Sequence, residues 1–348
     1  MVPITACTFL LALALGTTVT FASSHWLLAW MGLEINTLAI LPLMTKVHSP
    51  REVEAATKYF LAQAASTAML LFASTLNAWL TGQWTILDLS HPLPSTLVTL
   101  ALALKLGMAP LHAWLPDVIQ GLNFTTGLIV STWQKLAPLS LLLQIQAIPS
   151  TLVLALGLLS TLIGGWGGLN QTQVRKILAY SSIAHLGWMT LVLQCAPSLS
   201  LLALVTYIVM TTSAFLVFKF ASAKTISMLS LTWPKSPILT IICPLVLFSL
   251  GGLPPLTGFG PKWFIIFEFI KYDCPATATI AALSALLSLY YYLRLCYAIA
   301  LTMAPNTLSG LTPWRILALR PPLLLAPATI AATCLLPLIP LALALVMN

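Results

Sequence analysis

Four ionisable side chains lie inside long apolar stretches of the sequence. They are Glu34 in WMGLEINTLAILP, Lys105 in LALALKLGMAP, Lys135 in STWQKLAPLS and Lys262 in FGPKWF. Desolvation disfavours the charged form of a buried lysine, so such a side chain can gain and lose a proton near neutral pH. An arginine in the same place would stay protonated. A carboxylate and three lysines in apolar surroundings therefore indicate a proton relay.

The surroundings of these groups have the composition of a membrane protein. Of the 348 residues 59% are hydrophobic and only 6% are charged, against about 25% charged residues in soluble domains. So few polar residues cannot coat a large soluble core, and the sequence predicts an all-α polytopic membrane protein. The net charge of +8 is spread thinly between apolar runs, so we expect no nucleic-acid partner.

Apolar runs of the length that a bilayer requires recur along the whole chain. The candidate helices lie near residues 3–22, 24–45, 54–80, 96–119, 125–144, 150–169, 173–195, 199–222, 237–271, 276–303 and 322–347. This count predicts eleven transmembrane helices. The ninth run is too long for one simple span, and we interpret it as a single crossing interrupted by irregular backbone.

Basic residues are distributed unevenly between the loops. Loops after even-numbered helices contain Lys46, Arg51, Lys58, Arg175, Lys176, Lys224, Lys235, Arg315 and Arg320, whereas Lys271 is nearly alone in the others. Cytoplasm-like faces carry the excess of Lys and Arg. The N-terminus is therefore expected on the positive face, and an odd number of spans places the C-terminus on the opposite side.

Glycine and proline interrupt the fourth and ninth predicted helices. The fourth contains Gly107 and Pro110, and the ninth contains Pro254, Pro255 and Gly258. Backbone without hydrogen bonds at membrane depth is tolerated only beside protein or a wet cavity, so we expect water-filled breaks beside Lys105 and Lys262. The breaks lie five helices apart, as in transporters built from inverted repeats. The predicted division is a five-helix repeat over 1–145, an inverted repeat over 150–303 and a final helix over 322–347.

Glu34, Lys105 and Lys135 share a predicted depth. Each lies roughly 13–15 Å from a membrane face at about 1.5 Å per residue, in the middle of a core about 30 Å thick. Each costs on the order of 2.5–3.5 kcal/mol to insert. Lysines near helix ends can extend to the surface, but these residues are not near ends. A static ion pair between Glu34 and Lys105 remains the structural alternative.

Two histidines and a tyrosine are weaker candidates for the relay. His112 follows the first break and would either pass protons or make a structural hydrogen bond. His185 lies midway along the seventh helix, which corresponds to the second helix if the repeat is inverted, and Tyr180 is a hydroxyl neighbour. The six cysteines show no CxxC spacing, so no metal or iron–sulfur site is expected. No nucleotide, flavin or haem motif is evident.

Several motifs together resemble a known family. They are MGLEINTLAILPL, EAATKYFLAQA, LKLGMAPLHAWLPDV, WQKLAPL, GGLNQTQVRKILAYSSIAHLGWM, LGGLPPLTGFGPKW and LYYYLRL. The chain resembles the subunit-2 family of vertebrate mitochondrial NADH:ubiquinone oxidoreductase, one of the antiporter-like families of the respiratory complex I membrane arm. The likeness is weakest after about residue 303.

The resemblance implies roles for the buried groups. Glu34 and Lys105 would form a modulating pair, Lys135 would be the central relay lysine, and Lys262 would be the lysine of the second broken helix. Antiporter-like relatives often carry a lysine in helix 7 or 8, whereas this chain has His185 there. This departure from the family pattern leaves the expected link between the two halves without a lysine.

The resemblance also implies a location and partners. The positive face would be the mitochondrial matrix, with the N-terminus in the matrix and the C-terminus in the intermembrane space. Partners would be other membrane-arm and accessory subunits and phospholipids such as cardiolipin. NADH, flavin, iron–sulfur clusters and ubiquinone would bind in other subunits, and this chain would hold no cofactor. The buried residues alone also allow a stand-alone cation/proton antiporter or a non-translocating scaffold.

Overall fold

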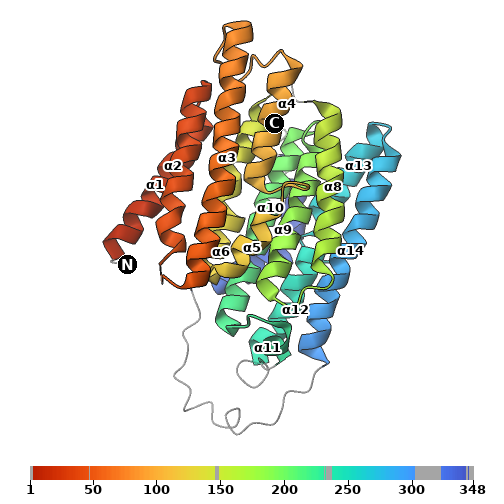
Figure 1. Ribbon diagram of the computed structural model, residues 1–348. Coiled ribbons are helices and arrows are strands. Elements are labelled where there is room, and N and C mark those ends of the chain that lie inside the picture. The colour runs from red at the N-terminus through yellow and green to blue at the C-terminus, as the bar shows by residue number, and fades with distance from the viewer. Residues whose placement is uncertain are drawn as a thin grey trace. The chain divides into compact units, whose positions relative to one another are not determined.

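The computed structural model describes residues 3–46, 48–145, 149–230, 232, 237–301, 323–341 and 344, and these residues are almost entirely helical (Figure 1). The chain divides into two compact units, Met1–Ser160 and Thr161–Asn348, with the boundary inside one helix. By length and composition, six of the described helices could cross a membrane, and three more are apolar but shorter. The all-α membrane architecture agrees with the sequence prediction.

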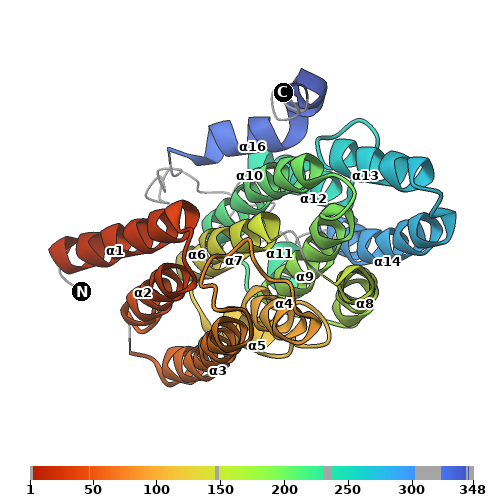
Figure 2. The ribbon, with the colours of Figure 1, turned by 90° about the horizontal axis from the view of Figure 1, so that it is seen from above.

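Unit 1 is a ring of helices. It contains α1 (Pro3–Ala22), α2 (Trp26–Met44), α3 (Pro50–Thr81), α4 (Pro92–Leu106), α5 (Trp114–Gly121), α6 (Phe124–Ser131), α7 (Trp133–Gln144) and the start of α8 (Ser150–Gly168). Each of the helices α1, α2, α3, α4 and α7 packs against the next, and α7 returns to α1 (Figure 2). Side chains of α2, α3, α4 and α7 therefore meet inside this ring.

Unit 2 contains the rest of α8 and the helices that follow it. These are α9 (Val174–Val192), α10 (Pro197–Ala221), the short α11 (Ile226–Ser230), α12 (Pro237–Gly251), α13 (Phe259–Lys271), α14 (Pro275–Ala300), α16 (Leu325–Cys334) and the 3-10 turn η2 (Leu336–Leu338). Helix α9 packs against α10, α13 and α14, so polar groups on α9 have neighbours on three sides.

Both expected breaks are present. The fourth predicted helix is divided into α4 and α5, and Gly107 ends α4 with φ 75°. The ninth is divided into α12 and α13, and Gly252 follows α12 with φ 81°. A positive φ is costly for residues with a Cβ atom, which explains glycine at both positions. The equivalence of the two halves as inverted repeats stays a prediction.

The fifth predicted helix, 125–144, is wrong as a single helix. It is interrupted between α6 and α7 at Thr132, which has φ −113° and ψ −66°. The hydroxyls of Ser131 and Thr132 both donate to the Leu128 carbonyl, at 3.0 and 2.7 Å. Hydroxyls that bond back to the preceding turn often bend helices, and both of these bonds lie at the interruption.

Other boundaries differ in smaller ways. Helix α3 begins at Pro50 and not near 54, because Ser49 caps it by accepting a hydrogen bond from the Glu52 amide at 3.3 Å. The predicted final helix is interrupted after α16 by η2. Of the residues used to predict orientation, Lys235, Arg315 and Arg320 lie outside the described residues, as does part of the predicted span 322–347.

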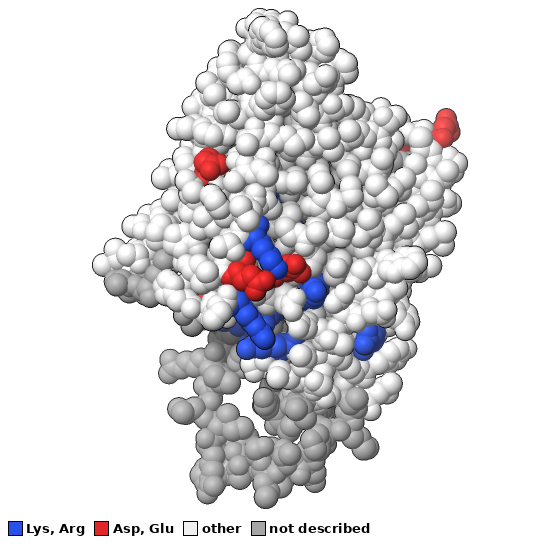
Figure 3. Space-filling view, in the orientation of Figure 1, with Lys and Arg blue, Asp and Glu red and all other residues white. Residues whose placement is uncertain are grey.

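Charged side chains are rare on the surface. Figure 3 shows one face on which most atoms belong to uncharged residues and the few charged ones gather in limited areas. The exposed ion pairs among the described residues join Lys58 to Glu54 at 2.9 Å, Lys58 to Asp117 at 3.5 Å, and Lys271 to Glu268 at 2.8 Å. Exposed leucines, phenylalanines and tryptophans are numerous, as expected for a surface that faces lipid.

The close approach of α12 to the start of α13 depends on Gly258. A methyl group there would overlap the Ser249 carbonyl oxygen and press on the Met210 sulfur. We expect Gly258→Ala to lower the free energy of unfolding by about 1–3 kcal/mol, the usual cost of overpacking. Scanning fluorimetry of the detergent-solubilised protein measures this as a lower melting temperature.

Gly82→Asn is the matched control for this prediction. Gly82 has φ 73° and nothing within 4 Å of an added Cβ, and asparagine tolerates that backbone conformation. A Gly258→Ala protein that melts with the wild type would contradict the proposed role of the close approach.

Candidate proton-transfer site

The break between α4 and α5 is held by side chains from neighbouring helices. The Trp114 Nε1 donates to the Leu104 carbonyl at 3.0 Å, and the Gln63 Nε2 donates to the Lys105 carbonyl at 3.3 Å. Carbonyls at a helix end need such partners when no further helical turn supplies them. The last turn of α4 is therefore fixed by protein donors from α5 and α3.

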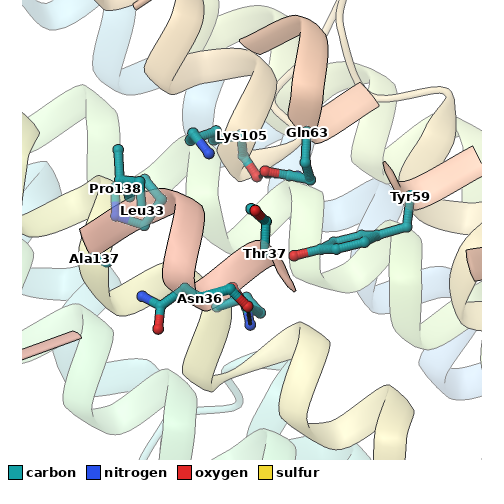
Figure 4. Close-up of a pocket in the computed structure, with 9 residues that line it drawn as sticks. Leu33, Asn36, Thr37, Tyr59, Gln63, Lys105, Ala137 and Pro138 are labelled. Carbon is teal, nitrogen blue, oxygen red and sulfur yellow. Dashed lines mark hydrogen bonds between the residues drawn. The ribbon is translucent and has the colours of Figure 1, made fainter. Parts of the chain in front are cut away.

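Lys105 lies in this last turn and is only 5% exposed. It lines a small polar cavity. The other lining residues are Leu33, Asn36, Thr37, Tyr59, Gln63, Gln134, Ala137 and Pro138. Figure 4 shows the Lys105 amine and the Thr37 and Tyr59 hydroxyls directed toward the same space. The free space inside is about the minimum that one water molecule requires. Helices α2, α3, α4 and α7 all contribute to it.

Glu34 lies on α2, one of the helices that form this site. It is half-buried on α2, and its Oε2 has no hydrogen-bond partner among the described residues. Its neighbours on α2, Leu33, Asn36 and Thr37, line the Lys105 cavity. Within the described part of the chain no ion pair of 4 Å or less joins Glu34 to Lys105. Among the described residues the structure thus does not contain the static ion pair considered above.

Lys135 lies in the first turn of α7 and is 2% exposed. It does not line the Lys105 cavity, but its neighbours on α7, Gln134, Ala137 and Pro138, do. The Gln134 Nε2 donates to the Asn36 carbonyl at 3.4 Å and ties α7 to α2. Lys105 and Lys135 therefore lie in the same part of the ring of helices in unit 1.

The second break contains Lys262 on α13. Its Nζ donates to the Gly251 carbonyl at the end of α12, at 2.8 Å. Pro254 and Pro255, which form the turn between the two helices, are exposed. The lysine itself thus supplies the donor that α12 lacks at its end, whereas Gln63 and Trp114 do so for α4.

His185 and Lys262 line one cavity of about 270 Å³ in unit 2. His185 on α9 is 9% exposed, and its ring centroid lies 5.5 Å from that of Tyr207 on α10. The rest of the lining is mainly apolar, with Met210 and Ile265 among its members. The structure therefore brings together two of the residues singled out in the sequence.

The other two relay candidates lie apart from these cavities. His112 is half-buried, with its Nδ1 3.2 Å from the Pro110 carbonyl oxygen within the first break. The Tyr180 ring is half-buried and packs against Gly167 of α8. Neither residue lines the cavity of Lys105 or that of Lys262.

Sequence reasoning missed the uncharged polar residues of the sites. Asn36, Gln63 and Gln134 line the same cavity as Lys105, and Tyr59 adds a hydroxyl to it. A signal was available, because Tyr59 and Gln63 are four residues apart and so share one face of a helix. An amide inside an apolar span indicates a buried polar site, as a charged residue does, because both need a polar partner.

We expect Gln63→Leu to loosen the first break. The Lys105 carbonyl would lose its side-chain donor, and a buried acceptor without a partner costs about 1–3 kcal/mol. Hydrogen exchange followed by mass spectrometry should show faster exchange over residues 105–113. The control is Gln144→Leu, because Gln144 donates to the Phe21 carbonyl at an exposed position where water can replace it. Equal exchange in both variants would refute the role of Gln63.

Comparison with known proteins identifies the family. The family described as NADH:quinone oxidoreductase/Mrp antiporter, transmembrane, matches residues 23–288, and NADH dehydrogenase subunit 2 C-terminus matches residues 289–343. NADH-ubiquinone oxidoreductase chain 2 of Tetraodon nigroviridis is 64% identical over 98% of both chains. The same chain of Salmo salar is 64% identical over 94% of this chain and 95% of its own.

Solved structures show the same fold. A chain of respiratory complex I from Thermus thermophilus, determined with bound aureothin, has a TM-score of 0.81 and 30% identity, and the match covers 99% of this chain and 78% of that one. A chain of the Mrp complex from Dietzia sp. has a TM-score of 0.80 at 20% identity, over 97% and 74%. With two matching families and relatives that are nearly two-thirds identical end to end, the chain belongs to the NADH-ubiquinone oxidoreductase chain 2 family and has the antiporter-like transmembrane fold.

Proposed function

We propose that this chain is a proton-translocating membrane subunit of the mitochondrial NADH:ubiquinone oxidoreductase. Its relatives over nearly the full length are chains of that enzyme in vertebrates, and the chain from the bacterial complex I shares its fold. The subunit is part of the enzyme and carries out no redox step itself. NADH, flavin, iron–sulfur clusters and ubiquinone belong to other subunits.

The observation that carries this proposal is the burial of Lys105 and Lys135 in one ring of helices. They are 5% and 2% exposed, and polar side chains line the cavity beside Lys105. A bundle built only for structure would gain stability from apolar residues at these positions, because burying a charge is costly. Retained ionisable groups at membrane depth are typical of ion pathways.

Each group has a distinct role in this proposal. Glu34 sets the electrostatic environment of Lys105, so a change in their separation makes Lys105 take up or release a proton. Lys135 accepts and donates protons next along the ring. In unit 2, Lys262 and His185 exchange protons within their shared cavity. His112 and Tyr180 would contribute only through water, since they lie outside both cavities.

The proposal includes a location and an orientation. The chain lies in the mitochondrial inner membrane, with its N-terminus in the matrix and its C-terminus in the intermembrane space, as the excess of basic loop residues favours. Its partners are other membrane-arm and accessory subunits of complex I, and phospholipids such as cardiolipin cover its apolar surface.

Replacement of Lys135 by Met tests the function. Lys135→Met removes the titratable group but keeps an apolar side chain of similar length. We expect proton pumping by the assembled complex in proteoliposomes to fall roughly tenfold or more, a conservative loss for a positioned proton-transfer group. NADH:ubiquinone turnover should fall with it, because the two are coupled.

Lys46→Met provides the control, since Lys46 is exposed at the end of α2. Assembly is checked by native gel electrophoresis of the complex. Full pumping by an assembled Lys135→Met complex would favour a purely scaffolding subunit over the proposed function.

A second substitution tests whether Lys135 must release its proton or need only carry a positive charge. Lys135→Arg keeps a positive charge that cannot be released at any pH of the experiment. If the proton itself must move, pumping by Lys135→Arg should be as low as pumping by Lys135→Met, with Lys46→Arg unaffected. Recovery of pumping in the arginine variant would mean that a fixed charge is sufficient, and the relay would be wrong.

A further inference from the structure

The C-terminal segment (residues 325–339) lies against the second break of unit 2. It comprises α16, η2 and Ile339. Helix α16 packs against α10 and α12 (Figure 2). Helix α12 leads into the break, and α10 forms part of the wall of the cavity that contains Lys262. The segment therefore supports two of the helices that form this site.

One hydrogen bond joins the C-terminal segment directly to the break. The Thr257 Oγ1 donates to the Ala332 carbonyl at 2.5 Å, and both residues are buried. Ala332 belongs to the last turn of α16, where carbonyls have no donor within the helix. Pro337, just beyond that turn, has no N–H to offer. The Thr257 hydroxyl thus satisfies an acceptor at the end of α16.

A second contact is made at the first turn of α13. Gly260 lies against the Ile339 side chain, and an added Cβ at Gly260 would be 2.7 Å from the Ile339 Cδ1. Ile339 is itself buried. Thr257 and Gly260 lie on either side of Phe259, the residue at which α13 begins. The C-terminal segment therefore contacts the chain just before and just after the start of α13.

The start of α13 in turn sets the position of the Lys262 amine. The Lys262 Nζ donates to the Gly251 carbonyl at 2.8 Å. An added Cβ at Gly252 would be 3.0 Å from the same Nζ, so the amine lies over the backbone of the break. Gly258, the neighbour of Thr257, lines the cavity of Lys262. A shift of the turn at Thr257 would move both the wall of this cavity and the helix that carries the lysine.

We propose that Thr257 is a positioning residue for Lys262, and that its hydrogen bond to Ala332 makes the C-terminal segment part of the unit 2 site. The hydroxyl acts through the backbone, because it holds the turn from which α13 directs the amine toward Gly251. Proton transfer requires the exchanging groups to lie within hydrogen-bond reach, so a small displacement of α13 slows it. This inference rests on the proposed function, since the position of Lys262 matters only if Lys262 transfers protons.

Thr257→Val tests this role, because valine keeps the branched shape and removes the hydroxyl. Thr257→Ser keeps the hydroxyl and removes only the methyl group. The matched control is Thr329→Val, since Thr329 is a buried threonine of α16 whose hydroxyl donates to the Ala326 carbonyl of its own helix at 2.9 Å. Each variant is measured in the intact complex by proton pumping in proteoliposomes, and native electrophoresis confirms assembly. If Thr257→Val does not assemble, Thr257→Ala replaces it in every comparison.

We expect Thr257→Val to pump about two- to tenfold more slowly, the range that corresponds to loss of one ordinary hydrogen bond. Thr257→Ser and Thr329→Val should pump at the wild-type rate. Hydrogen exchange followed by mass spectrometry should be faster over residues 252–260 in Thr257→Val than in either of these variants, because the turn has lost its tie to α16.

A double-mutant cycle distinguishes positioning of Lys262 from a general contribution to stability. Lys262→Met is measured alone and in combination with Thr257→Val. If Thr257 acts through Lys262, adding Thr257→Val to Lys262→Met should cause no further loss of pumping, because the two effects are not additive. A merely structural hydrogen bond would slow pumping by the same factor in both backgrounds.

Two outcomes overturn the positioning role and remain distinguishable from failure of the proposed function. Wild-type pumping by Thr257→Val, while Lys262→Met pumps slowly, would show that the site is functional without this hydrogen bond. An equal further loss in the Lys262→Met background would assign the hydroxyl to stability alone. Full pumping by an assembled Lys262→Met complex would instead overturn the function assigned to the unit 2 site, and the positioning role with it.

Discussion

The central constraint on this fold is the free-energy cost of a lysine side chain in a bundle that offers few polar atoms. Charge transferred out of water must be compensated by nearby dipoles, opposite charge or water. Around Lys105 the polar groups that line the cavity are the amides of Asn36, Gln63 and Gln134 and the hydroxyls of Thr37 and Tyr59. Most other features of unit 1 can be understood as ways to assemble that small polar volume from helices whose remaining surface is apolar.

Interrupted helices are the means by which the backbone contributes to this volume. Both long breaks expose the carbonyls of a helix end close to a lysine, and both satisfy them with protein donors. The donors differ between the units. In unit 1, Gln63 and Trp114 cap α4 and Lys105 only lies beside the end. In unit 2, Lys262 is the cap, so its position is tied to the backbone of α12.

Much of this arrangement could be predicted from residue types and spacing. Ionisable residues in apolar runs identified the buried Lys105 and Lys135, whereas Lys262 is half-buried, and Gly107 and Pro110 identified the first break. Other features depend on contacts that periodicity does not encode. At the interruption at Thr132, two neighbouring hydroxyls bond back to the Leu128 carbonyl. Tyr180 is close to His185 in sequence, yet it packs on Gly167 of α8, because five residues along a helix turn a side chain to another face.

The bond from Lys262 to the Gly251 carbonyl has a consequence for how the second break responds to charge. An ammonium group has three N–H donors, and the neutral amine still has two. The same hydrogen bond can therefore be made in either state, while the neutral nitrogen gains a lone pair able to accept from a partner in the space shared with His185. In the proposed relay, Lys262 therefore changes its charge without losing the hydrogen bond that ends α12.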